Sequence, residues 1–243
     1  MKKSAVKSLI YKEFYMAKKP MLIQTITLLF FAVLGILIEI SFQMGNLALL
    51  PDAVLKEIKG TADVSVIIYP VFAACCFTYT MSDGSLKDED VAWKRFSYTL
   101  PAGAINFALA KFISFLILMV FESIFSFAYV ALACHFIGVA FSKVYVSYIL
   151  ILIAFTTFMA VINHTGILLF HTRDKAGLFM TGILFALIFL AVFLNRNILK
   201  IEFTGEGIEK AAVWLSPWLL GAIVVIWVLG FLISVMLLKR REK

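Results

Sequence analysis

The sequence predicts an all-α integral membrane protein with six transmembrane helices. Of its 243 residues, 63% are hydrophobic and only 15% are charged, and the mean hydropathy is +0.99. A soluble domain has about a quarter of its residues charged and about half apolar. Long apolar stretches also separate the charged residues, and a helix needs roughly 20 such residues to cross a bilayer. We therefore expect one transmembrane domain that covers residues 1–243.

The gaps between charged residues give the boundaries of the six spans. Five gaps contain no Asp, Glu, Lys or Arg, and Lys111 and Glu122 interrupt a further apolar region. The expected spans are residues 21–43, 64–82, 105–133, 144–170, 176–195 and 213–238. Two segments outside the hydrocarbon complete the layout, an amphipathic helix at 1–20 and a charged loop at 83–104.

The distribution of Lys and Arg predicts that both termini face the cytoplasm of the cell. With six spans in that orientation, 16 of the 22 basic residues belong to cytoplasmic segments and their edges, and six lie outside. The positive-inside rule favours this arrangement. The net charge of +7 is then explained by topology and by contact with anionic membrane lipid, so we expect no nucleic-acid partner.

The first 20 residues show the pattern of an interfacial, or elbow, helix. Apolar residues recur at helical spacing with lysines towards the other side: Val6, Leu9, Ile10 and Phe14 against Lys3, Lys7 and Lys12. A basic amphipathic helix of this kind lies in the plane of the headgroups. A positive flank that only sets the topology is the alternative, and both interpretations stay open. Pro20 marks the expected turn into the bilayer.

Catalytic and metal-binding motifs are missing from the sequence. It contains no phosphate-binding G-x-x-x-x-G-K-[ST] loop, no H-E-x-x-H zinc motif and no G-x-S-x-G nucleophile elbow. The three cysteines have no spacing typical of a metal site or a disulfide framework. We therefore expect no metal, no cofactor and no enzymatic activity in this chain by itself.

Polar residues inside the expected spans are candidates for a function. Glu122 lies in the third span, where an ionised carboxylate costs a few kcal/mol and should face protein or water. Asn163 and His164 form a polar notch in the fourth span. These side chains could line a translocation path, or they could hydrogen-bond between helices and hold the bundle together. Lys111 lies about 16 Å from Glu122 along a helix axis, so we expect it to reach the cytoplasmic interface instead.

A charged loop that also carries an aromatic residue lies between the second and third spans. Its distinctive side chains are Asp88, Glu89, Asp90, Trp93, Lys94 and Arg95. In a chain that is otherwise mostly apolar, such a segment is suited to contact a cytosolic partner. A loop that is simply solvated is the alternative interpretation.

The layout of the chain and one local motif resemble the ABC-2-type transporter permeases. The motif is Trp-Lys-Arg-Phe-Ser-Tyr-Thr-Leu-Pro at 93–101, followed by Ala110 and Lys111. Small members of that family show an acidic residue and a Trp, then Thr-Leu-Pro before a helix with an Ala-Lys or Ser-Lys pair. This chain departs from the pattern at 102–106, Ala-Gly-Ala-Ile-Asn, where a basic residue is frequent.

The resemblance implies the permease subunit of an exporter in a bacterial plasma membrane. Such a subunit dimerises with a second copy or a paralogue, and a separate ATPase binds ATP and Mg. The ATPase docks on the loop between the second and third spans, so the six loop residues named above would contact it, with Trp93 as the buried anchor. The small subgroup exports amphipathic cargo, including toxin peptides, which implies a peptide or lipid-like substrate here.

Two other classes of protein remain open. An ion-coupled secondary transporter should show inverted repeats and helices broken by Gly or Pro near the midplane. Only Pro70 and Pro217 lie inside the expected spans, and no two halves of the sequence match. An accessory or sensor protein without transport activity is the other class. A neighbouring gene for a lone ATPase would distinguish the ABC permease from both.

Overall fold

The computed structural model describes residues 2–43, 68–78, 80, 103–137, 141–170, 173–196 and 205–241. Over these residues the protein consists of long helices and one short one. The helices are α1 (Lys2–Gln43), the short helix Ile68–Thr78, α4 (Gly103–Ile137), α5 (Lys143–Phe170), α6 (Arg173–Leu194) and α7 (Gly205–Arg241). The all-α prediction is thereby confirmed for the described part of the chain.

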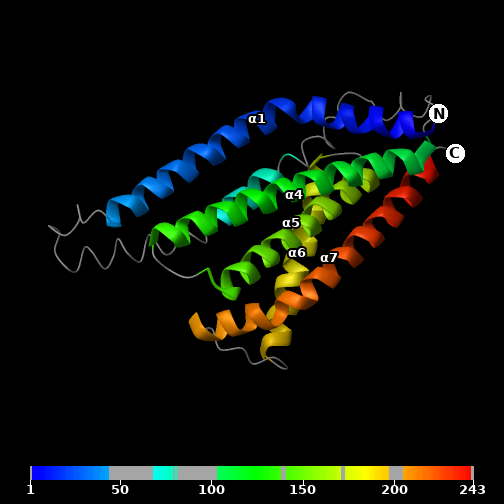
Figure 1. Ribbon diagram of the computed structural model, residues 1–243. Helices are drawn as coiled ribbons and strands as arrows, with labels where there is room; N and C mark the ends of the chain where they lie inside the picture. Colours follow the sequence, from blue (N-terminus) through cyan, green and yellow to red (C-terminus); the bar gives the residue numbers. More distant parts are fainter. Residues whose placement is uncertain are drawn as a thin grey trace.

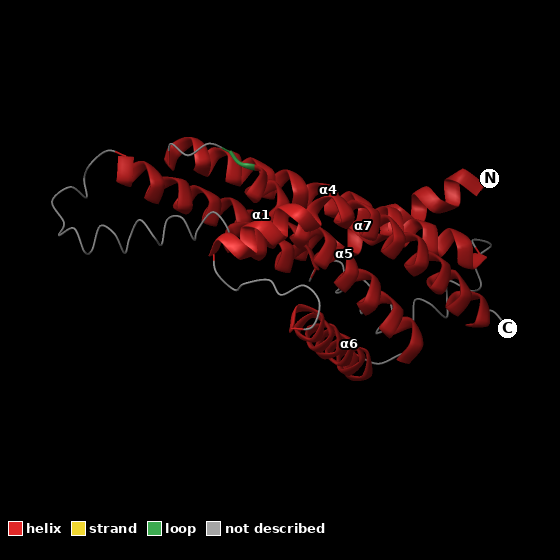
Figure 2. Ribbon diagram, turned by 90° about the horizontal axis from the view of Figure 1, so that it is seen from below, coloured by secondary structure: helices red, strands yellow, loops and turns green. Residues whose placement is uncertain are grey.

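Among the residues that the structure describes, four helices are long and apolar enough to cross a membrane. The apolar stretches are Ala5–Leu37, Gly103–Phe136, Lys143–Phe170 and Glu209–Arg240. The short helix Ile68–Thr78 is apolar and lies inside the expected second span, 64–82. These features indicate a membrane protein. The count of six spans and the cytoplasmic location of both termini stay predictions, although the two termini lie at the same end of the bundle (Figures 1 and 2).

The central helices of the bundle are α4 and α5. α4 contacts α1, α5 and α7, and α5 also contacts α6 and α7 (Figure 1). α6 lies at the edge of the bundle (Figure 2). The most apolar stretches of α4 and α5 are 44% and 50% buried, against 11% in α1 and α7. The outer helices therefore carry most of the apolar surface that a membrane would cover.

α1 joins the expected N-terminal helix and the first span into one helix of 42 residues. Pro20 lies inside this helix, and Figure 1 shows that the helix bends roughly midway. A proline removes a backbone donor and is a common cause of such a bend. The expected turn at Pro20 is thus a bend within one helix.

The apolar side of the segment 1–20 packs against protein. Leu9 and Ala110 of α4 form a small buried cluster, with Val6, Ile10 and Phe107 around it. A helix that lies alone in the headgroup plane would bury this side in lipid. In the structure α4 covers the apolar side of this segment, so the expected interfacial helix packs against the helix bundle.

Helix boundaries agree well with the expected third, fourth and sixth spans. α6 (Arg173–Leu194) covers nearly all of the expected fifth span, 176–195, but it is not one of the four helices identified as candidate spans. α4 and α5 contain the expected 105–133 and 144–170, and α7 contains 213–238. Gly103 begins α4 with a φ of 63°, which glycine adopts without a steric penalty from a Cβ atom. Gly103 belongs to the stretch 102–106 that departs from the permease motif. Because α4 begins at this residue, residues 103 and 104 belong to the helix, and the expected loop at 83–104 is corrected at its end.

Candidate functional site

Buried polar side chains gather on the two central helices. On α4 and α5 they are Lys111, Ser114, Glu122, Ser126, Ser147, Thr156, Thr157, Asn163 and His164. Burying a polar group away from water raises the free energy of the folded state unless the group forms a hydrogen bond or ion pair. We therefore expect a partner for each of these side chains. Lys111, Glu122 with Thr156, and His164 mark three separate positions along the α4–α5 pair, each with its own group of contacts.

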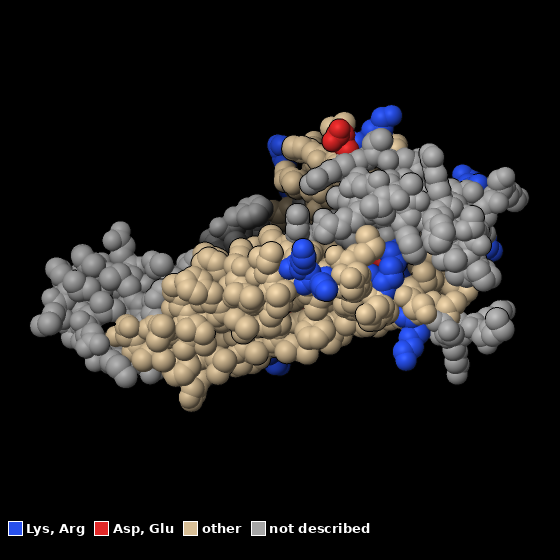
Figure 3. Space-filling model, turned by 90° about the horizontal axis from the view of Figure 1, so that it is seen from above, with Lys and Arg blue, Asp and Glu red and all other residues tan. Residues whose placement is uncertain are grey.

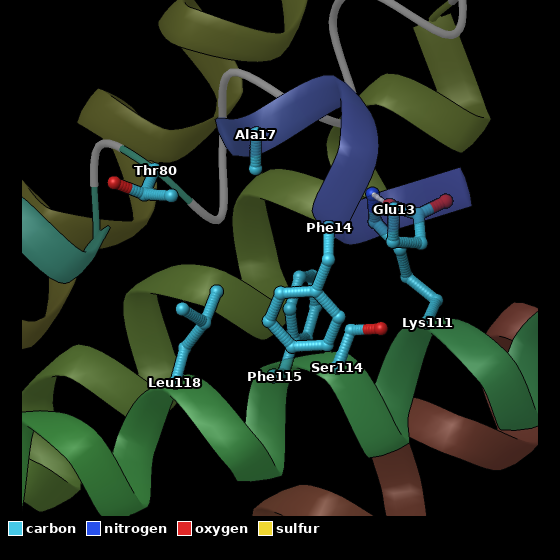
Figure 4. A pocket seen from close by; sticks show the side chains of 8 residues that line it. All are labelled: Glu13, Phe14, Ala17, Thr80, Lys111, Ser114, Phe115 and Leu118. Carbon is cyan, nitrogen blue, oxygen red and sulfur yellow. Dashed lines mark hydrogen bonds and ion pairs between the residues drawn. The ribbon is translucent and has the colours of Figure 1, made fainter. Parts of the chain in front are cut away.

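The first group is an ion pair between α1 and α4. Lys111 Nζ lies 2.5 Å from Glu13 Oε2, and the two side chains are 7% and 15% exposed. The ammonium group also lies 5.6 Å from the centre of the Phe115 ring. Lys12 Nζ contacts the other oxygen of Glu13 at 3.4 Å. That Lys111 reaches the cytoplasmic interface stays a prediction; the structure shows that its ammonium group is buried and directed towards Glu13 of the N-terminal segment (Figure 4).

A small cavity adjoins the ion pair and collects residues from three segments. It has a volume of about 20 Å³, which is room for about one water molecule. Its lining residues are Glu13, Phe14, Ala17, Thr80, Lys111, Ser114, Phe115 and Leu118 (Figure 4). Thr80 also donates a hydrogen bond from Oγ1 to Gln24 Oε1 of α1. α1 therefore makes polar contacts on both sides of residues 81–102. Gln24 accepts a hydrogen bond from Thr80 before this segment, and Glu13 forms an ion pair with Lys111 after it.

The second group joins Glu122 of α4 to Thr156 of α5. Glu122 is 1% exposed, and its Oε1 accepts a hydrogen bond of 3.1 Å from Thr156 Oγ1. The same hydroxyl lies 3.0 Å from the carbonyl oxygen of Ile153. Glu122 Oε2 has no hydrogen-bond partner among the residues that the structure describes. Glu122 thus lies inside the protein, with half of its hydrogen-bonding capacity unused there.

We expect Thr156→Val to lower the free energy of unfolding by about 0.5–1 kcal/mol, because hydrogen bonds between membrane helices contribute about that much. In the Glu122→Leu background the same substitution should have a smaller effect, since the acceptor is already gone. A double-mutant cycle of unfolding free energies measures the difference. Equal costs in both backgrounds would show that the hydroxyl acts only on its own helix.

The third group surrounds His164 at the meeting point of α4, α5 and α7. The His164 ring meets Phe112 and Phe115 edge-on, with ring centres 6.1 Å and 5.8 Å apart. Phe112 in turn contacts Trp227 and Phe231 of α7. Phe115 lies seven residues from Glu122, roughly 10 Å along α4. Glu122 and His164 are therefore buried on one pair of helices but do not form a single site.

Two predicted site elements need separate mention. Asn163 is buried on α5 beside His164 in sequence. The six predicted ATPase contacts, Asp88, Glu89, Asp90, Trp93, Lys94 and Arg95, lie outside the described residues. The proposed docking of a partner on that loop stays a prediction.

Sequence reasoning missed Glu13 and the contact of α7 with α5. Glu13 is the first acidic residue of the chain and the only one before Glu39, and this isolation on a basic helix was a usable signal. On α7, Gly230 and Ser234 are buried at a spacing of four. Small residues at this spacing let membrane helices approach closely. A Cβ atom at Gly230 would lie 2.4 Å from Val161 Cγ1 of α5.

The fold and these buried polar groups define a helical membrane protein with polar side chains in its interior. Among the described residues, no group of three or more His, Cys, Asp or Glu side chains could hold a metal ion. No protein-family model matches the sequence, and no curated protein or solved structure matches it significantly.

Proposed function

We propose that this chain is the membrane subunit of an ABC exporter that moves an amphipathic substrate, such as a peptide, across a bacterial plasma membrane. Energy would come from a separate cytosolic ATPase that binds ATP and Mg. The proposal rests on the resemblance of residues 93–101 and of the Ala110–Lys111 pair to the ABC-2-type permeases. A second permease copy or a paralogue would complete the transporter.

The observation that carries the proposal is the contact made by the Ala110–Lys111 pair. Ala110 is 2% exposed and packs on Leu9, and Lys111 pairs with Glu13. A small residue followed by a cation is what this contact requires, because the small side chain admits α1 closely and the cation neutralises the buried carboxylate. The motif residues thus join the first helix to the helix that follows the proposed ATPase loop.

This contact suggests how ATPase movement could reach the bundle. Separating a buried ion pair leaves each charge without its partner in a region of low dielectric, which is strongly unfavourable. α1 and the beginning of α4 should therefore move as one unit when the loop that precedes Gly103 is displaced. Glu122 lies further along α4, whereas Asn163 and His164 of α5 lie near the level of the ion pair, where His164 contacts Phe112 and Phe115. These polar side chains would meet the polar groups of a substrate if the central helices part.

The test is co-expression of the chain with its cognate ATPase, which a gene neighbouring this one would identify. We expect the purified chain to hydrolyse no ATP, and the complex to do so. Trp93→Ala should weaken the complex about thirtyfold, since loss of a buried aromatic anchor costs about 2 kcal/mol. Trp214→Ala is the matched control, because Trp214 is an exposed tryptophan on α7. Co-purification and ATP hydrolysis are the measurements.

Hydrolysis by the isolated chain, or equal assembly of the Trp93 variant and the control, would contradict the proposal. Glu122 favours one other function, an ion-coupled secondary transporter, because such proteins use buried carboxylates in their spans. In that case transport into vesicles would continue without the ATPase and stop when the proton or sodium gradient is collapsed. ATP-dependent transport that survives gradient collapse would exclude it.

A further inference from the structure

One face of α1 is exposed along nearly the whole helix. Its residues follow each other at intervals of three or four: Lys7, Tyr11, Tyr15, Lys18, Leu22, Ile26, Leu29, Val33 and Leu37. This spacing places them on one side of a helix. The opposite side is packed, with Leu9, Ala17 and Leu28 buried. α1 therefore has a single outward face whose chemistry can be followed from end to end.

The chemistry of that face changes near Lys18. From Leu22 onward it is entirely apolar, as expected of a surface in contact with hydrocarbon. Before that point it carries only tyrosines and lysines. Figure 3 looks down on the α1 side: the blue Lys and Arg side chains lie in the middle and right-hand part of the view, and the tan surface at the left has none. Tyrosine and lysine are the residues that membrane helices place at headgroup level.

Three residues of this face, Tyr11, Tyr15 and Lys18, contact one another in succession. The rings of Tyr11 and Tyr15 stack with their centres 6.2 Å apart, and Lys18 Nζ lies 4.7 Å from the centre of the Tyr15 ring. The two tyrosines are 70% and 59% exposed. The one acidic residue of this part of α1, Glu13, is turned away and paired with Lys111. The outward face is therefore cationic.

We propose that this tyrosine–lysine face binds the headgroups of anionic phospholipids. It is formed by Lys7, Tyr11, Tyr15, Lys18 and Lys19, the last of which is exposed and lies four residues after Tyr15. Continuity with the apolar half of the same face holds it at the membrane surface, because α1 bends but does not break between the two halves. Charge complementarity selects anionic over zwitterionic lipid. Each lysine near such a surface contributes about fivefold in affinity.

This binding mode differs from that of an ordinary amphipathic helix. The apolar side of the segment packs on α4, so it is not available for insertion into lipid. The headgroups would instead meet the opposite side, and the helix would be held between lipid and protein. The inference does not depend on an ATPase partner. An acidic protein surface is the competing occupant, and the test includes it.

The test measures thermal unfolding of the purified full chain in neutral detergent while phosphatidylglycerol or phosphatidylcholine with the same acyl chains is added. We expect phosphatidylglycerol to raise the apparent Tm more than phosphatidylcholine does. The variant with Lys7→Gln, Lys18→Gln and Lys19→Gln should need about a hundredfold more phosphatidylglycerol for half of the rise, because three fivefold contributions are lost. Its response to phosphatidylcholine should be unchanged.

The control removes the same number of exposed positive charges elsewhere, through Lys143→Gln, Lys175→Gln and Arg196→Gln. It should respond to phosphatidylglycerol as the unmodified protein does. Equal losses in both triple variants would overturn the proposal in favour of a general effect of net charge. The proposal would also be overturned if the variant with Lys7→Gln, Lys18→Gln and Lys19→Gln responded to phosphatidylglycerol as the unmodified protein does. Stabilisation by an acidic peptide such as polyglutamate without any preference for phosphatidylglycerol would overturn it as well, and it would identify a protein partner.

Discussion

Replacement of Lys111 by methionine should lower the free energy of unfolding by about 3–5 kcal/mol, the cost of breaking a buried ion pair from one side. The substitution preserves most of the volume of the side chain and removes its charge. Glu13 would keep only the more distant Lys12, whose Nζ lies 3.4 Å from Oε1, against 2.5 Å between Lys111 and Oε2. Equilibrium unfolding in mixed micelles with a denaturing detergent measures the change.

Two further variants separate the loss of charge pairing from the loss of packing. Glu13→Leu combined with Lys111→Met removes both charges, and it should recover most of the stability because an apolar pair replaces an ionic pair with little net cost. Lys143→Met is the matched control, since Lys143 is exposed at the start of α5, and it should change the unfolding free energy by less than about 0.5 kcal/mol. If Lys111→Met cost no more than this control, the ion pair would not contribute to stability.

Replacement of Gly230 by leucine should lower the free energy of unfolding by about 3 kcal/mol, at the upper end of the usual cost of overpacking. The first atom of any side chain at this position would lie 2.4 Å from Val161 Cγ1 and 3.3 Å from the Phe112 ring. Valine is branched at Cβ and cannot turn away easily. α7 would therefore have to move away from α5.

The same helix supplies the control for this prediction. Gly221 on α7 is exposed and has no atom within 4 Å of the position of an added Cβ. Gly221→Leu should therefore leave stability unchanged or raise it slightly, through the better helix propensity of leucine. Gly230→Ala should lower the free energy of unfolding less than Gly230→Leu does. Adding Val161→Ala to the Gly230→Leu variant should restore part of the lost stability, because it removes the methyl groups that clash with the new side chain. Failure of that rescue would place the strain elsewhere in the bundle.

The sequence by itself was sufficient to predict the helical class and most helix boundaries. Charged residues mark the ends of apolar stretches, because charges are costly in hydrocarbon and a span needs a fixed length. α5 and α7 accordingly contain the expected spans at 144–170 and 213–238. The same cost argument predicted that Glu122 would face away from lipid, and the structure buries it between helices.

Only the tertiary structure decided which surfaces meet each other. Glu13 and Lys111 are separated by 98 positions in the sequence, and no local pattern connects them. The apolar side of the N-terminal segment fits a lipid surface and a protein surface equally well, because lipid tails and apolar side chains are chemically alike. The contact with α4 determines that the apolar side of this segment faces protein. As a result the tyrosine–lysine face points outward, so a contact between residues distant in the sequence determines which surface is available to the membrane.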